Sequence, residues 1–232
     1  MKNLFIIATL LFHSTIYASL AQVVKLKGNA TYVSNGMRDA KNLELNQWLE
    51  NDTSILTSEK SFLVLKYKNG NEVTLGPKSK IIIDINSTSE VKDQQVMSLI
   101  VGKLKASVKN PEATNTNKVL IKTNSAALGI RGTEFQTSYN PESKITSLIT
   151  FHGAVAMAKV DSKSLTPISN KAIEDDLKKE SVTVKLGEFS SISESNKKII
   201  EPVKISPEQF TKLKMNETLS AENTKIDEAK FK

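Results

Sequence analysis

The sequence predicts an all-β protein of many short strands in a two-layer β-roll or solenoid-like sandwich, with a short C-terminal helix and a flexible tail. Three observations predict this class. Apolar and polar residues alternate with period two through most of residues 22–159, which is typical of strands with one buried face. Turn residues separate the apolar runs at short intervals. Helical periodicity is nearly absent from the same stretch.

The first element, residues 1–21, is predicted to be a signal peptide. A short basic start is followed by the apolar run Leu4–Phe12, and Ser19 and Ala21 are small residues at the positions that a signal peptidase recognises. A membrane anchor is the alternative, but this run is shorter than the roughly 20 residues that span a bilayer. We therefore expect cleavage near Ala21, no membrane span, and a periplasmic, cell-surface or secreted protein.

The strands and turns of residues 22–160 follow from the pattern. Residues 103–109 and 133–139 alternate and predict half-buried strands. The unbroken apolar runs Phe62–Leu65 and Ile81–Ile83 predict strands that are covered on both faces. Turns are expected at residues 68–71, at residues 76–79, at Gly102 and at residues 139–142. The Asn-Gly pair within residues 68–71 is the strongest hairpin signal.

Helical segments are expected at three places. Leu43–Leu49 could form one or two turns that bury Leu45, Trp48 and Leu49. The polar insertion at about residues 161–180 suggests a surface loop with a short helix, before a final hairpin in residues 182–192. Ser206 and Pro207 form a good helix start within a charged C-terminal helix and tail, residues 194–232.

Composition excludes several classes of site. The 232 residues contain no cysteine and two histidines, so disulfides and thiolate sites are impossible and a histidine-based metal site is not expected. No nucleophile elbow, phosphate loop or carboxylate pair is visible. We expect no catalytic residue, no metal and no cofactor.

The net charge of +7 is consistent with an anionic envelope polymer, with lipid headgroups or with solubility alone. Nucleic acid is not an expected partner, because no aromatic residues are interleaved with the basic ones. A solvated basic face is the favoured interpretation over a polyanion groove.

A series of short phrases carries more information than any single motif. It resembles the FecR-like domain family over residues 22–193, with phrases at residues 24–30, 49–57, 61–79, 99–106, 121–135, 150–157 and 184–189. The most specific is residues 121–135, which include Gly129, Arg131 and Gly132. Asn51 and Asn69 replace the family's usual glycine and aspartate, and both tolerate a positive φ. The best-known members are transmembrane regulators that pass an envelope signal to a sigma factor, and that function is not carried over.

Three residues are candidates for a site, each with a structural alternative. Arg131 could bind a carboxylate or phosphate, but pairing with Glu134 or capping of carbonyls is favoured. His152 is expected in a turn rather than as a general base, since no nucleophile or second acid stands at a suitable spacing. Trp48 is expected in the core rather than as a sugar platform.

These observations predict a non-enzymatic periplasmic binding or scaffold module with a FecR-like domain. Its partner would be an envelope protein, docked on a sheet face or edge, for example in a signalling system. The alternative is an accessory protein that binds peptidoglycan or another anionic envelope polysaccharide through basic faces and Trp48.

Overall fold

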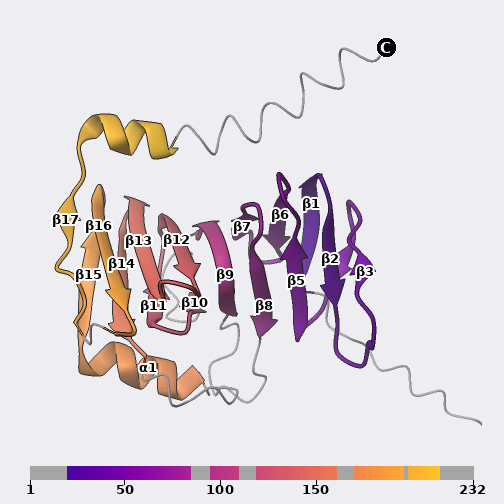
Figure 1. Ribbon diagram of the computed structural model, residues 1–232, viewed down its shortest axis with the longest axis horizontal. Helices are drawn as coiled ribbons and strands as arrows, with labels where there is room; N and C mark the ends of the chain where they lie inside the picture. Colours follow the sequence, from indigo (N-terminus) through magenta and orange to yellow (C-terminus); the bar gives the residue numbers. More distant parts are fainter. Residues whose placement is uncertain (1–19, 85–94, 110–118, 161–169, 196–197, 215–232) are drawn as a thin grey trace, which may run out of the picture.

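The computed structural model describes residues 20–84, 95–109, 119–160, 170–195 and 198–214 (Figure 1). The strands stand side by side along the long axis of the molecule and form two sheets, here called sheet A and sheet B. The all-β prediction is confirmed. The predicted signal peptide up to residue 19 and the tail from residue 215 lie outside the described residues, and the predicted cleavage after Ala21 falls one residue into the first strand.

Sheet A is antiparallel throughout. Its strands, in spatial order, are β4 (Trp48–Leu49), β1 (Ala21–Lys27), β6 (Phe62–Tyr67), β7 (Glu72–Leu75), the second half of β9 (Gln95–Ser107), β12 (Glu134–Asn140), β13 (Ile145–His152), β16 (Glu188–Ser193) and β17 (Val203–Lys204).

Sheet B has one parallel pair, between β9 and β10. Its strands, in spatial order, are β3 (Lys41–Asn42), β2 (Ala30–Val33), β5 (Thr53–Thr57), β8 (Lys80–Asp84), the first half of β9, β10 (Val119–Lys122), β11 (Ala126–Ile130), β14 (Ala154–Lys159) and β15 (Ser181–Lys185).

Strand β9 belongs to both sheets and joins them. Up to Val101 it pairs with β8 of sheet B, and from Gly102 it pairs with β7 and β12 of sheet A. Gly102 has a φ of +95°, a conformation that side chains rarely adopt. The turn predicted at Gly102 is therefore wrong, because the strand continues through this residue and changes sheet there.

Other layer changes also use residues with positive φ. Gly28, Gly132 and Gly153 stand at crossings between the sheets, with φ values of +74°, +61° and +74°. The predicted final hairpin is a crossing of this kind, because β15 pairs with β14 in sheet B whereas β16 pairs with β13 in sheet A. Gly187, between them, has a φ of +74°.

The core lies between the two sheets and follows the predicted alternation. In residues 103–109 and 133–139 the inward side chains are buried: Leu104, Ala106, Val108, Thr133, Phe135, Thr137 and Tyr139. The prediction that two apolar runs are covered on both faces is wrong. Phe62, Val64 and Ile82 point outward and are half-buried, because no described element packs over them.

The helical turns predicted for Leu43–Leu49 are absent. The segment instead passes from β3 to β4 through a turn in which Asn46 has a φ of +66°. Leu43 and Leu49 are buried, whereas 57% of Leu45 is exposed. A helix would have placed Leu45 and Leu49 on one face. The turn at Asn46, which lies between them, instead leaves Leu45 outward and Leu49 inward.

Two helices cover parts of the outer faces. Helix α1 (Asn170–Lys179) is the short helix expected in the polar insertion, and its Ile173 and Leu177 pack on sheet B over small residues that include Ala127 and Gly129. The second helix, residues 207–214, begins as predicted, with the hydroxyl of Ser206 accepting a hydrogen bond from the amide of Gln209 at 3.2 Å.

Candidate binding surfaces

Arg131 lies at the crossing from β11 to β12 and is exposed. The ion pair expected with Glu134 is not formed, because Glu134 Oε1 lies 2.9 Å from Lys105 Nζ instead. Lys105 and Glu134 stand on adjacent strands, whereas Arg131 precedes the bend at Gly132. Arg131 has no ion pair with any residue that the structure describes.

His152 is an exposed residue at the end of β13, directly before the crossing at Gly153. This position agrees with the predicted turn. His152 stands opposite Glu134 in the strand register, and the two side chains form no hydrogen bond. Within the described parts of the chain, no group of three or more potential metal-ligating side chains gathers at His152 or elsewhere.

Trp48 is exposed, so its predicted place in the core is wrong. In the edge strand β4 the buried position belongs to Leu49, and alternation turns Trp48 to the outer face of sheet A with 47% of its surface exposed. Lys68 Nζ lies 5.7 Å from the centre of the indole ring. Trp48 therefore has the exposure that a ligand-stacking residue requires, with a cation beside it.

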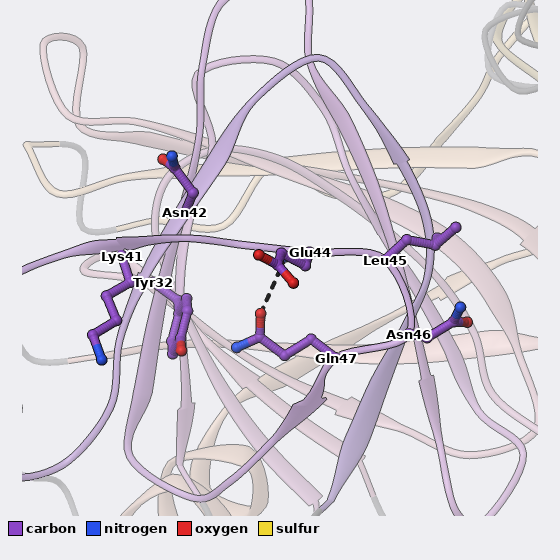
Figure 2. Close-up of a pocket in the computed structure, with 7 residues that line it drawn as sticks. All are labelled: Tyr32, Lys41, Asn42, Glu44, Leu45, Asn46 and Gln47. Carbon is purple, nitrogen blue, oxygen red and sulfur yellow. Dashed lines mark hydrogen bonds between the residues drawn. The ribbon is translucent and has the colours of Figure 1, made fainter.

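A shallow pocket opens at the β3 end of the sandwich. Figure 2 shows its lining, and its volume is about 650 Å³. The lining residues are Tyr32, Lys41, Asn42, Glu44, Leu45, Asn46 and Gln47. The Gln47 side chain accepts a hydrogen bond from the amide of Glu44 at 3.1 Å, which fixes the loop across the pocket. This lining offers amide, hydroxyl, ammonium and carboxylate groups for hydrogen bonding.

Part of the outer face of sheet A, here called the open face, has no described helix or strand packed over it. It consists of the outward side chains of residues 21–27, 62–67, 72–75, 102–107 and 134–140, which belong to β1, β6, β7, β9 and β12. In the register, Lys25 stands next to Val64, Val64 next to Thr74, and Thr74 next to Lys105. The neighbouring row begins with Lys27 beside Phe62. Half-buried apolar side chains thus lie among cationic ones.

The open face is basic. Five lysines and two glutamates point outward from it. The lysines are Lys25, Lys27, Lys66, Lys103 and Lys105, and the glutamates are Glu72 and Glu134. Lys105 pairs with Glu134, and Lys66 Nζ lies 4.0 Å from Glu72 Oε1. Lys25, Lys27 and Lys103 have no ion pair with any described residue.

The C-terminal segment marks one border of the open face. Phe210 packs edge-on against Phe151 of β13, with ring centres 5.6 Å apart, and Phe151 is 3% exposed. On the other side of Phe151, Lys105 Nζ lies 5.3 Å from the ring centre. Among the described residues, this segment therefore borders the open face at Phe151 of β13.

The comparisons with known proteins agree with this fold. Residues 53–156, from β5 into β14, match the family model described as FecR protein. This match confirms, over residues 53–156, the resemblance to the FecR family that the sequence predicted. No curated protein matches the chain.

Two crystal structures of a proposed anti-sigma factor from Parabacteroides distasonis are similar to this chain, each with a TM-score of 0.50 and 14% sequence identity. The similarity covers 68% of this chain and 62% of that protein. It establishes a shared fold. Among the described residues, no helix is long and apolar enough to cross a membrane.

Proposed function

We propose that this protein is a non-enzymatic docking module of the bacterial cell envelope, which binds a protein partner in the periplasm as part of a signalling system. The observation that carries the proposal is the open face. An uncovered sheet face with half-buried Phe62 and Val64 and unpaired Lys25 and Lys103 offers a partner both apolar contact and charge.

The signalling role is supported by the FecR domain and by the fold shared with a proposed anti-sigma factor. An anti-sigma factor acts by binding another protein, so the comparison favours a protein partner over a small molecule. The periplasmic location rests on the predicted signal peptide of residues 1–21.

The non-enzymatic part of the proposal rests on the geometry of two candidate site residues, His152 and Arg131. His152 and Arg131 are both exposed, and the side chain of neither has a hydrogen bond or ion pair with a described residue. A general base normally has an orienting partner and lies beside a concave site. The pocket at the β3 end does not include either residue.

Affinity capture from solubilised cell envelopes tests the proposal. The chain from residue 22 is immobilised, and retained material is analysed for both protein and glycan. One abundant protein, retained at stoichiometric yield, is the expected result. Retention of glycan without protein would contradict protein docking.

A second candidate function, binding of peptidoglycan or another envelope polysaccharide, is favoured by the exposure of Trp48. Its indole presents 47% of its surface beside Lys68. Isolated sacculi should then retain the protein at low salt and release it at high salt. Trp48→Ala should abolish retention, and Leu45→Ala, at an exposed residue of the same loop, should leave it unchanged. Equal retention of both variants would exclude this candidate.

A further inference from the structure

We infer that the open face binds an acidic, extended segment of the protein partner. Apolar side chains of that segment would lie on Phe62 and Val64, and its carboxylates would lie among Lys25, Lys27 and Lys103. This inference rests on the proposed docking function, and it specifies both the surface and the chemistry of the partner.

The spacing of the side chains suits an extended chain. Phe62 and Val64 are two residues apart on β6, which places them about 7 Å from each other on one face. An extended segment that runs along β6 repeats its own side chains with the same period. Two alternate apolar side chains of the partner can therefore contact Phe62 and Val64 together.

The unpaired lysines flank this apolar pair on both sides. Lys25 and Lys27 stand on β1, directly beside Val64 and Phe62. Lys103 stands on β9, which is separated from β6 only by β7. With neighbouring strands about 4.8 Å apart, the cations border a strip about 14 Å wide. Carboxylates on either side of the partner's apolar residues would reach them.

Charge complementarity favours an acidic segment over a basic or neutral one. Each exposed ion pair contributes little by itself, so several pairs and the apolar contact must act together. The two glutamates of the open face lie near Lys66 and Lys105. Among the residues that the structure describes, Lys25, Lys27 and Lys103 thus have no internal carboxylate and can pair with carboxylates of the partner.

The apolar pair also distinguishes a protein segment from two other anionic partners. A charged glycan without apolar substituents would leave Phe62 and Val64 without matching contacts. A lipid surface binds through apolar side chains that protrude into it. Phe62 and Val64 are half-buried between their neighbours and do not protrude in that way.

The outer face of sheet B provides a matched control. Leu56 on β5 is 45% exposed, more than Val64, and it stands beside Lys80 of β8. It therefore has a large apolar side chain next to a lysine, as Val64 does, but on the opposite sheet.

Site-specific photocrosslinking in cells tests the inference. A benzophenone amino acid replaces Val64 in one full-length variant, Gln136 on β12 in a second, and Leu56 in a third. Position 136 keeps the test informative if replacement of Val64 impairs folding, which circular dichroism of each purified variant would reveal. Cross-linked peptides are identified by mass spectrometry.

We expect one protein to cross-link at positions 64 and 136. The cross-linked peptide should carry a net negative charge, and the yield of the same cross-linked protein at position 56 should be at least fivefold lower. Lys103→Glu should reduce the yield at position 64 at least fivefold, and Lys80→Glu should leave it unchanged. A protein that cross-links mainly at position 56, or through a basic or neutral peptide, would overturn the inference and leave protein docking intact. Absence of any protein at all three positions, with glycan retained in the envelope capture, would overturn both.

Discussion

Ser79 lies directly against Gly102 at the point where β9 passes from sheet B to sheet A. The Ser79 hydroxyl accepts a hydrogen bond from the amide of Lys103 at 2.9 Å. A Cβ atom on residue 102 would lie 2.6 Å from Ser79 Cα, which is closer than packed atoms approach. The crossing that joins the two sheets therefore depends on the missing side chain of Gly102 as well as on its φ of +95°.

Gly102→Ala should destabilise the protein by about 2–4 kcal/mol, because it adds backbone strain to a clash with backbone and side-chain atoms of Ser79. Chemical denaturation gives the free energy of unfolding. Gly36→Ala is the control, since Gly36 has a φ of +80° but no atom within 4 Å of the added Cβ. Gly36→Ala should lower the free energy of unfolding by only about 1 kcal/mol, because it adds backbone strain without a clash. Equal losses for both variants would show that the contact with Ser79 is unimportant.

Phe210→Ala should weaken the attachment of residues 207–214 to sheet A. The edge-on contact with Phe151 contributes about 0.5–1.5 kcal/mol beyond the apolar area that it buries. Amide hydrogen exchange should become faster in that helix and at Phe151. Leu213→Ala, at a residue of the same helix that is 37% exposed, should leave the exchange rates unchanged. Faster exchange in both variants would mean that the helix is marginal as a whole.

Thr146→Val should lower the free energy of unfolding by about 1–3 kcal/mol, although valine has nearly the same shape as threonine. The Thr146 hydroxyl lies 2.6 Å from the hydroxyls of both Thr123 and Ser125, and all three residues are buried. Valine leaves the Ser125 hydroxyl without this partner. Thr31→Val, on the outer face of sheet B, should change the unfolding free energy by less than about 0.5 kcal/mol. A neutral Thr146→Val variant in the same denaturation assay would contradict the importance of this hydroxyl cluster.

The stability of the protein should fall above about pH 10, partly through Tyr67. Burial raises the pKa of the Tyr67 phenol above its usual value of 10.0, and a hydrogen bond with Gln95 lowers this pKa in part. The unfolded chain therefore releases the phenolic proton at a lower pH than the folded protein, so this contribution is complete below pH 10 and declines as the pH rises further.

Tyr67→Phe should accordingly make the loss of stability above pH 10 less steep. Between pH 8.5 and 11, the urea midpoint of the wild type should fall relative to that of the variant as the pH increases. All other ionisable groups are the same in both proteins, so the difference between the two curves isolates Tyr67. Parallel curves would contradict the raised pKa of Tyr67.

The alternating strands were predictable because a two-residue period depends only on local burial. Leu104 and Phe135 illustrate this, since each is buried within a run whose intervening residues face outward. Gly102 shows where the argument fails. A glycine in a period-two pattern is consistent with a turn or with a bend within one strand, and only the pairing partners on both sheets decide between them.

The residues of the candidate surfaces were harder to predict because their surroundings come from distant strands. Trp48 was expected in the core for its size, but the edge position of β4 allowed only Leu49 to face inward. Glu134 was assigned to Arg131 by proximity in sequence, whereas Lys105 on the neighbouring strand lies closer in space. The apolar run Phe62–Leu65 gave no sign that its outer face is uncovered. The pairing of Lys25 with Val64 in the register, which defines the open face, becomes visible only in the folded sheet.

The central claim, that the open face docks a protein partner, is tested most directly by comparing envelope capture with three immobilised proteins. These are the wild type, the double variant Lys25→Glu/Lys103→Glu, and the control Lys80→Glu on the outer face of sheet B, all verified as folded by circular dichroism. We predict that the wild type and the control retain the same partner at equal yield, and that the double variant retains at least tenfold less. Equal yields from all three proteins would contradict docking through the open face.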